Sequence, residues 1–293
     1  MHSISMTQAV IGNGKGQDVT FLGHHVTIEG LDGDEDYDIL AIFDGHGPKR
    51  DSENIFMASL RTAPFADLLS AADPVAAVVG YFNTIQYDIQ CGAVGLIAKI
   101  FKDRVQGWSV GDCKGLVFLD GELVYQTQGH CSRNMAEMER VAAHCPHHFR
   151  EPGQTICAVS PTEVTMVNNH YTIFPVPRFA TTVKLAPTQS FGHHNATGYD
   201  PETFVIPFTR HQRVRVALMS DGVVDMTAWT SAEDLAFFST ATAPMIAEFA
   251  ENRWKQPWTQ MHAGRSYPGQ YFPRDQYDDI GCVVWSKEGE PTL

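Results

Sequence analysis

The sequence lacks long apolar runs, a basic N-terminal leader and closely spaced cysteines. No stretch of eighteen apolar residues occurs among the 293 residues, which argues against a membrane-spanning helix. Residues 1–6 contain no basic segment followed by an apolar stretch, so a secretory signal is not expected. The six cysteines form no CxxC pair and are too sparse for a disulfide scaffold. We therefore expect a cytoplasmic or nuclear protein with reduced cysteines, not secreted and with no membrane partner.

Positive charge is also scarce. The 21 Lys and Arg residues are outnumbered by 34 Asp and Glu, which gives a net charge of −13. Such a chain repels nucleic acid, so no nucleic-acid partner is expected. Hydrophobic residues make up 43% of the chain, which excludes a mainly disordered protein. Acidic side chains gathered in one site could instead bind divalent cations, and these cations would attract phosphate.

Hydrophobic patterning predicts strands in groups that do not alternate with helices. The Asp73-Pro74 pair is typical of a helix start, and Asp120-Gly121 is typical of a tight hairpin turn. This order argues for an α+β fold in which helix pairs cover sheets, in a single domain over residues 1–293. Strands are expected over 18–29, 39–43, 93–101, 107–110, 115–119, 122–126, 214–219 and 280–285, and helices over 52–90, 134–143 and 231–255.

Acidic residues stand at the ends of several predicted strands, usually beside glycine. A strand fixes the position of such a carboxylate, and the neighbouring glycine lets backbone carbonyls and water approach closely. Mg²⁺ and Mn²⁺ prefer carboxylate, carbonyl and water oxygens. The pattern therefore predicts a divalent-metal site, provided that the strand ends converge. The residues concerned are Asp44, Asp112, Asp221 and Asp278, with Asp225 one helical turn after Asp221.

Four motifs follow one another in a fixed order: Asp44-Gly45-His46-Gly47, Val110-Gly111-Asp112, Ser220-Asp221-Gly222-Val223-Val224-Asp225 and Asp278-Asp279-Ile280. They resemble the motifs of the metal-dependent protein phosphatases of the 2C class. The resemblance spans roughly residues 12–285 and implies an antiparallel β-sandwich flanked by pairs of helices, with a site for two Mn²⁺ or Mg²⁺ ions at one end. It also implies a variable flap beside the site, which fits the poorly patterned segment 145–180.

The resemblance assigns a role to each matching position. Asp44 would bridge the two cations, the Gly45 carbonyl would bind one of them, and Asp221 and Asp278 would hold the other. Asp112 and Asp225, with Asp221, match positions for a third, weaker cation, and Asp18 would order water beside the cations. Water activated by the cations would attack phosphorus while His46, as general acid, protonates the leaving serine or threonine oxygen. The expected enzyme is a monomeric hydrolase that acts on phosphorylated protein.

Several positions depart from the family's pattern. Gln17 stands where a Glu is common, and Asn13 stands in place of the usual phosphate-binding Arg. Lys15 is near that place but out of register, and it remains the candidate for substrate binding. Other replacements are Gly129-His130 for an Asp-His pair, His193 for the Asp after Gly192, and Asp279 for an Asn. These changes affect substrate handling more than the central metal ligands, so we expect an active but divergent enzyme.

Other interpretations of the same residues remain open. Asp before Gly is common turn chemistry, so the carboxylates could be turn caps, and His46 could be structural. A catalytically weak or inactive phosphatase-like binding module and a phosphatase for small metabolites are alternative functions. A zinc site at 144–148 is disfavoured because the spacing of its His and Cys residues is not a standard one.

Overall fold

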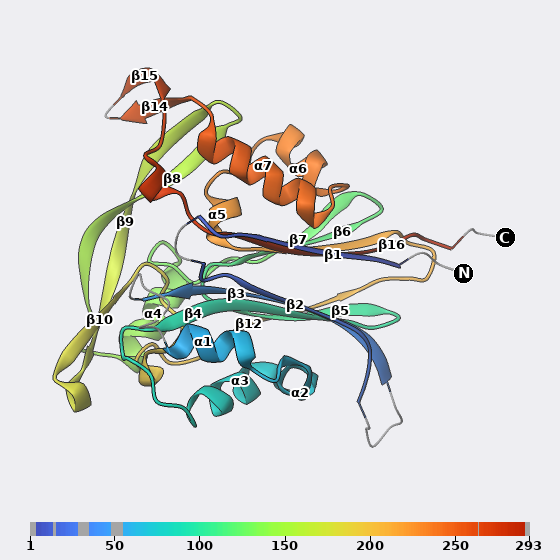
Figure 1. Ribbon diagram of the computed structural model, residues 1–293, viewed down its shortest axis with the longest axis horizontal. Helices are drawn as coiled ribbons and strands as arrows, with labels where there is room; N and C mark the ends of the chain where they lie inside the picture. Colours follow the sequence, from blue (N-terminus) through green and yellow to red (C-terminus); the bar gives the residue numbers. More distant parts are fainter. Residues whose placement is uncertain (1–3, 14–15, 29–34, 48–54, 263, 291–293) are drawn as a thin grey trace.

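Two antiparallel sheets lie face to face in the computed structural model, which describes residues 4–13, 16–28, 35–47, 55–262 and 264–290 (Figure 1). The first sheet has the order β1 (Ile4–Ile11), β16 (Ile280–Lys287), β13 (Val214–Met219), β6 (Lys114–Leu119) and β7 (Glu122–Gln126). The second has the order β12 (Glu202–Pro207), β5 (Arg104–Val110), β4 (Gly92–Ile100), β3 (Glu35–His46) and β2 (Val19–Ile28), with β11 (Phe191–Gly192) paired to β4. The predicted α+β sandwich is confirmed.

Alternating side chains along each central strand fill two different cores. In β13, Val214, Val216 and Leu218 point into the core between the sheets, where they meet residues of β3 and β4. Ala217 and Met219 point the other way, into the core between the first sheet and its helices. Full burial of a Val or Leu side chain stabilises a fold by about 1.5–3 kcal/mol, so this double packing fixes both the register and the layer order.

Helices cover both outer faces (Figure 1). The sequence predicts one or two helices over 52–90, and three form: α1 (Ile55–Thr62), α2 (Phe65–Ser70) and α3 (Pro74–Phe82). Asp73 caps α3 as predicted, since its carboxylate accepts a 2.9 Å hydrogen bond from the Ala76 N–H. The predicted 231–255 helix is in fact two helices, α6 (Ala232–Phe238) and α7 (Ala243–Lys255), which follow the short α5 (Asp221–Val224).

The segment with weak strand signals forms the longest hairpin of the protein. β8 (Phe149–Ser160) pairs with β9 (Glu163–Val176), and a third sheet continues through β10 (Thr181–Leu185), β14 (Trp258–His262) and β15 (Arg265–Gln270). Both faces of this hairpin carry polar residues, so no clear alternation marks it in the sequence. Figure 1 shows it beyond one end of the sandwich, braced by α4 (Met135–His144) through Val141 and Phe174. Within the described residues there are also three short 3₁₀ helices: Pro177–Phe179, His193–Asn195 and Arg274–Gln276.

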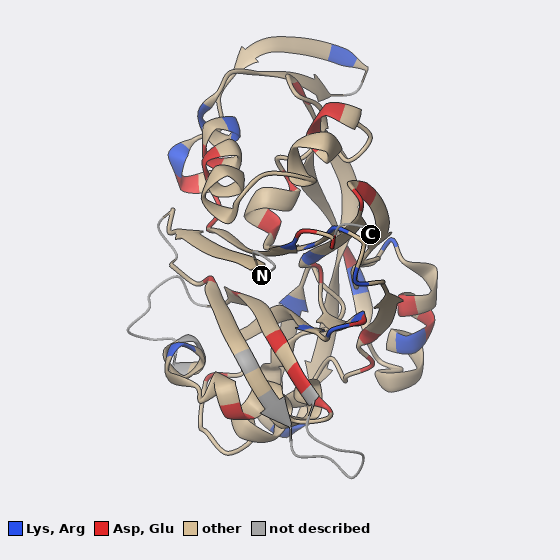
Figure 2. Ribbon diagram, turned by 90° about the vertical axis from the view of Figure 1, so that its right-hand side faces the viewer, with Lys and Arg blue, Asp and Glu red and all other residues tan. Residues whose placement is uncertain are grey.

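Charged residues are not confined to one helix or strand of the described structure. Figure 2 shows acidic and basic residues distributed over both helices and strands. Among the described residues, no helix is both long and apolar enough to cross a membrane.

Candidate active site

The topology brings the ends of distant strands to one end of the sandwich. Asp221 follows β13 directly, and Asp278 precedes β16, which runs antiparallel to β13, so the two residues meet at the same edge. Asp44 lies in β3, which continues to His46 because Asp44, Gly45 and His46 pair with β4. The Asp221 N–H lies 3.5 Å from Asp44 Oδ2. The predicted convergence of these carboxylates therefore occurs, although Asp44 stands inside its strand and not after it.

Asp18 joins this group from the start of β2. Its Oδ2 accepts a 2.7 Å hydrogen bond from the Ser220 hydroxyl, which itself accepts a 2.8 Å bond from the Gly281 N–H. Asp18 is only 6% exposed, and its Oδ1 has no hydrogen-bond partner among the residues that the structure describes. A buried carboxylate oxygen without a donor is costly, so this atom is suited to a positively charged ligand.

The clustered carboxylates disfavour one another's ionisation. Burial, opposed by the Ser220 hydrogen bond and reinforced by Asp279 and Asp278, raises the pKa of Asp18 to about 7. Burial, followed by the charges of Asp221, Asp18 and Asp278, raises the pKa of Asp44 well above its ordinary value. Burial and then Asp278 raise the pKa of Asp221 likewise. In the absence of cations the cluster is electrostatically strained.

Two further aspartates extend the cluster along one side. Burial raises the pKa of Asp112 to about 6 and, together with Asp112, raises the pKa of Asp225 to about 8. These two residues and Asp221 line a cavity of about 250 Å³. Lys114 and Arg133 line the same cavity, and the positive charge of Arg133 partly offsets both shifts. The positively charged side chain of Arg133 therefore lies next to the part of the cluster that matches the third cation position.

The side chain of Asp279 fixes the loop that contains Asn13 and Gln17, two positions that depart from the family's pattern. Its Oδ1 accepts a 2.7 Å hydrogen bond from the Asn13 N–H, and its Oδ2 accepts one of the same length from the Gln17 N–H. The Asn13 amide donates to the Asp278 carbonyl at 2.7 Å. A carboxylate can satisfy both backbone donors at once, which explains why Asp suits this position when the common Asn would offer only one acceptor. Lys15, the predicted substrate-binding residue, lies outside the described residues.

His46 contacts a second histidine, His193, which stands where the family usually has an Asp. His46 Nε2 lies 2.7 Å from His193 Nε2 and 3.0 Å from the Ser190 hydroxyl oxygen. His193 is fully buried, its Nδ1 is 2.7 Å from the Ile89 carbonyl oxygen, and burial lowers its pKa to about 4. A carbonyl only accepts, so the neutral His193 ring has its proton on Nδ1 and a lone pair on Nε2. The proton between the two rings therefore belongs to His46 Nε2.

The described residues contain no three His, Cys, Asp or Glu side chains already closed around one point at metal-binding distance. The donor set nevertheless fits divalent cations: carboxylates from separate segments face one another, and Asp18 has an unused buried oxygen.

The sequence identified the acidic residues but not their supports. It did not single out Arg133, which faces the cluster from two residues before α4, nor Ser220 as the link between Asp18 and β16. Ser220 is the first residue of the motif that contains Asp221 and Gly222, so the sequence did offer a signal for its role. Arg133 follows no strand and belongs to no motif, so the sequence offered no signal for it.

Comparison with known proteins finds similarity in fold but not in sequence. No protein-family model matches the sequence, and no curated protein matches it. Solved structures do match. A serine-threonine phosphatase 2C from Toxoplasma gondii is 15% identical with a TM-score of 0.55, covering 98% of this chain and 95% of that one. A serine/threonine phosphatase from S. agalactiae is 15% identical with a TM-score of 0.52, covering 98% and 100% of the two chains.

A sex determining protein from C. elegans is also similar, with 15% identity and a TM-score of 0.57. The alignment covers 97% of this chain but only 64% of that protein. These matches show that the chain has the fold of the 2C-class phosphatases, as the ordered motifs predicted. At such low identity the likeness concerns the fold, and activity has to be argued from the site itself.

Proposed function

We propose that this protein is a metal-dependent phosphatase that hydrolyses phosphoserine and phosphothreonine in proteins. The observation that carries the proposal is the meeting of Asp18, Asp44, Asp221 and Asp278, from four separate segments, at one end of the sandwich. A fold does not require such a cluster for stability, since buried like charges oppose folding. Its presence on a phosphatase fold supports a catalytic role.

In this proposal Asp44, the Gly45 carbonyl, Asp221 and Asp278 hold two Mn²⁺ or Mg²⁺ ions. Asp112 and Asp225 hold a third, weaker one, and Asp18 orders water. Bound divalent cations supply an acidified water as nucleophile and neutralise phosphoryl charge. Ser220 keeps Asp18 in place by its 2.7 Å hydrogen bond. His193 holds the Nε2 proton of His46, so the proton for the departing serine or threonine oxygen would come from Nδ1 of the protonated His46 ring.

Substrate phosphate needs a cation on the protein because Asn13 replaces the expected arginine and holds the Asp278 carbonyl instead. Arg133 and Lys114 face the cavity beside Asp221 and Asp225, and we include Arg133 as the phosphate-orienting group. Lys114 is less available, since its Nζ donates to the Thr127 carbonyl at 2.7 Å. Lys15 would be a second candidate if the loop places it near the cluster. The β8–β9 hairpin, which contributes Thr155 and Asn169 to the cavity, would contact the peptide around the phosphorylated residue.

The test uses the purified chain with Mn²⁺ or Mg²⁺, an aryl phosphate and a phosphothreonine peptide. Hydrolysis of both should require the metal, stop with a chelator and be lost in Asp44→Asn and Asp221→Asn. Arg133→Gln should raise KM with a smaller effect on kcat, because it removes an interaction with ground-state and transition-state phosphate alike. Undiminished activity in the presence of chelator would contradict the proposal.

A second function is favoured by one observation: Asn13 stands in place of the usual phosphate-binding arginine. A phosphatase-like module that binds phosphoprotein without turnover would share the same site. Calorimetry with Mn²⁺ and a phosphopeptide separates the two, since tight binding with no released phosphate would favour the module. A substrate panel that includes small phosphorylated metabolites tests the remaining alternative. In each case the whole of residues 1–293 is taken as one domain, acting as a monomer in the cytoplasm or nucleus.

A further inference from the structure

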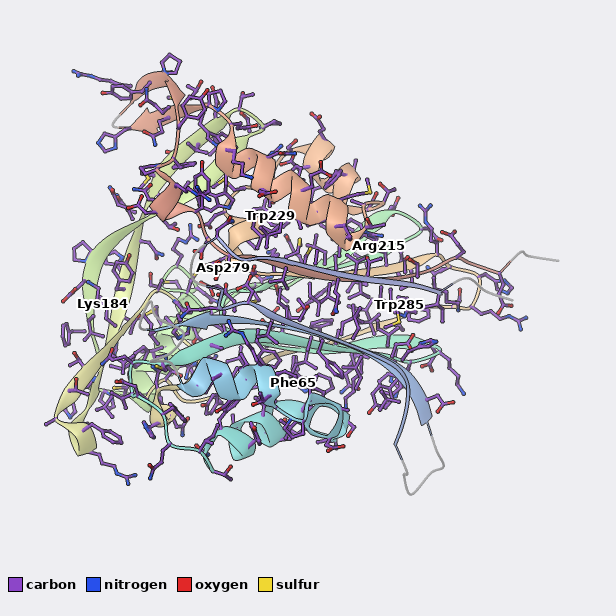
Figure 3. All side chains as sticks on the ribbon, in the orientation of Figure 1. Phe65, Lys184, Arg215, Trp229, Asp279 and Trp285 are labelled. Atoms are coloured by element: carbon purple, nitrogen blue, oxygen red, sulfur yellow. The ribbon has the colours of Figure 1, made fainter. Side chains whose placement is uncertain are left out.

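A buried arginine breaks the apolar pattern of β13 far from the acidic cluster. Arg215 points to the same face as Ala217 and Met219, which pack against the helices, yet it carries a charge there and is only 7% exposed. In Figure 3, Arg215 lies nearer the end of the sandwich that holds the chain termini, whereas Asp279 lies toward the end beside the β8–β9 hairpin. Arg215 lies six positions before Asp221 along β13 and its continuation, which corresponds to roughly 20 Å.

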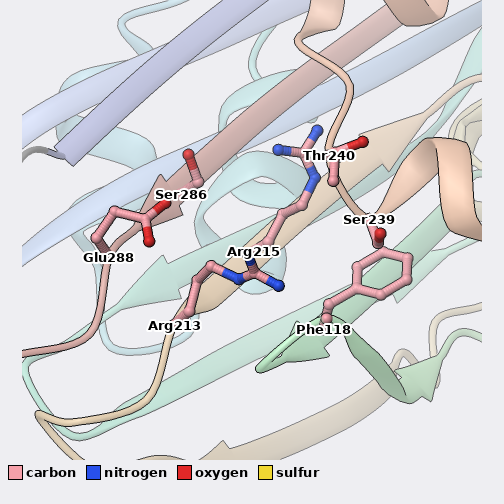
Figure 4. Close-up of a pocket in the computed structure, with 8 residues that line it drawn as sticks. Phe118, Arg213, Arg215, Ser239, Thr240, Ser286 and Glu288 are labelled. Atoms are coloured by element: carbon pink, nitrogen blue, oxygen red, sulfur yellow. The ribbon is translucent and has the colours of Figure 1, made fainter.

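A cavity of about 150 Å³ opens over this position (Figure 4). The side chains of Arg215 in β13 and of Arg213 just before β13 both extend into the cavity, since residues two apart along an extended chain share a face. Hydroxyl groups surround them, from Ser239 and Thr240 in the turn between α6 and α7 and from Ser286 of β16, which is the register partner of Arg215. Phe118 and Gly121 complete the wall, and Glu288 contributes the one acidic side chain among the lining residues.

The guanidinium of Arg215 is only partly satisfied by the protein. Its Nε donates to the Phe238 carbonyl at 2.7 Å, but its buried Nη2 has no hydrogen-bond partner within the described part of the chain. Burial, and then the positive charge of Arg213, lower the pKa of Arg215 to about 10, which leaves it charged at neutral pH. A buried charge without a counter-charge strongly opposes folding. Two adjacent arginines increase this cost, so the site is suited to an anion.

We propose that this cavity binds a small tetrahedral oxyanion of the phosphate class, held by Arg215 and Arg213 and by the surrounding hydroxyls. The planar guanidinium of arginine matches the oxygens of phosphate, and the Ser286 hydroxyl can donate to a remaining one. The Ser239 and Thr240 hydroxyls donate to the Ala236 and Phe237 carbonyls, so they would have to turn toward the anion to bind it. The two arginines and Glu288 leave a net positive charge in the cavity. The cavity is small, so it suits the phosphate group itself and not a bulky ester. This site is independent of the acidic cluster and does not depend on the proposed catalytic function.

The experiment uses the full chain in chelator-containing buffer, where the acidic cluster holds no cation and repels anions. Melting temperature and calorimetry are measured against inorganic phosphate, with sodium chloride at matched ionic strength as the control. Phosphate should raise the melting temperature of the wild type well above the effect of chloride, because a ligand that binds only the folded state stabilises it.

Three variants assign the effect to the cavity. Arg215→Met removes the buried charge but keeps an apolar side chain of similar length. It should fold with at least the wild-type melting temperature in phosphate-free buffer and lose the response to phosphate. Arg213→Gln, at an exposed position, should weaken phosphate binding about tenfold, the effect of one lost charge-assisted hydrogen bond. Glu288→Gln should tighten binding, because it removes the opposing charge.

A phosphoserine-containing peptide added in a parallel titration distinguishes the source of the phosphate. Binding of inorganic phosphate alone identifies a site for the free ion, whereas competition by the peptide identifies a site for a phosphorylated side chain. The proposal is overturned if wild type shows no response beyond chloride, or if Arg215→Met responds to phosphate as strongly as the wild type does.

Discussion

His46 and His193 are joined by a 2.7 Å contact between their Nε2 atoms. His193 is in turn fixed by the Ile89 carbonyl at its Nδ1 and by the Cys91 carbonyl at its backbone N–H. It occupies a backbone position with φ of 50°, directly after Gly192 at φ of 87°. A non-glycine residue adopts this region at a cost, so the surrounding structure holds His193 where its lone pair meets His46. We interpret His193 as a positioning residue that determines which nitrogen of His46 carries the proton.

The first prediction concerns this pair. His193→Phe removes the acceptor and should lower turnover of a phosphopeptide about 10- to 100-fold, the usual range for a misplaced general acid. Hydrolysis of an aryl phosphate with a good leaving group should change little, because that leaving group needs no proton. His193→Gln, which still offers an acceptor, should recover part of the loss. Equal losses on both substrates would mean that His193 supports the fold and not the orientation of His46.

The second prediction concerns the acidic cluster in the absence of metal. Asp44→Asn removes one of several mutually repelling charges, so the metal-free protein should become more stable by about 1–2 kcal/mol. The same variant should lose the rise in melting temperature that Mn²⁺ produces in the wild type, since a cation bound to the folded state stabilises it.

Asp67→Asn is the matched control for this measurement, because Asp67 is exposed on α2, away from the cluster. It should keep the wild-type response to Mn²⁺. If Mn²⁺ stabilises Asp44→Asn as much as the wild type, Asp44 is not a ligand.

The third prediction concerns the close approach of α5 to Asp279, the residue just before β16. A Cβ added at Gly222 would lie 2.0 Å from the Asp279 carbonyl oxygen, too close for any real contact. Gly222→Ala should therefore destabilise the protein by about 2–4 kcal/mol in urea unfolding. It should also weaken Mn²⁺ binding, because Asp279 clamps the loop that leads to Asp18.

Gly80→Ala provides the comparison, since a Cβ there meets nothing within 4 Å on α3. That substitution should be neutral or stabilise the protein by up to about 1 kcal/mol. Similar unfolding curves for the two variants would contradict the steric argument.

Much of the sandwich could be predicted because its central strands are strongly apolar and its turns carry specific residues. Val214–Met219 and Ile280–Lys287 are buried nearly throughout, and Asp120 and Gly121 adopt the positive φ angles that the predicted hairpin turn requires. The edge strands β1, β12 and β15, and β14 next to β15, were not predicted. They are partly exposed and mix polar with apolar residues, so tertiary pairing determines them more than local pattern does.

The candidate site, like the fold, could be predicted only in part. The carboxylates could be predicted because each stands next to glycine or at a strand end, which are local features. The partners of these carboxylates could not. Asp279 reaches Asn13 across 266 positions, and His193 reaches His46 across 147, so only the folded topology brings them together. Arg215 is another such case, because an arginine in a strand is usually exposed and only the covering helices make it buried.

The last prediction concerns Lys99, which is buried in β4 with 2% exposure. Its Nζ donates to the Ser70 and Ala71 carbonyls at the end of α2, at 3.1 and 2.6 Å, and lies 5.1 Å from the centre of the Tyr37 ring. Burial, opposed by the charge of Asp73, lowers the pKa of Lys99 to about 8. The unfolded chain therefore binds a proton more tightly here than the folded one does. Stability should rise with pH between about 8 and 10.5 on account of this group.

Lys99→Met removes this titration, so the two proteins should diverge in urea unfolding as the pH increases. The free energy of unfolding of the wild type, relative to that of Lys99→Met, should increase by about 1–3 kcal/mol from pH 7.5 to pH 10. Other groups that titrate in this range are common to both proteins and cancel in the difference. Well below pH 8 the Lys99 amine is protonated in both the folded and the unfolded state, so the difference should be flat there. A difference that stays constant up to pH 10 would show that Lys99 keeps an ordinary pKa, and that its two carbonyl partners offset its burial.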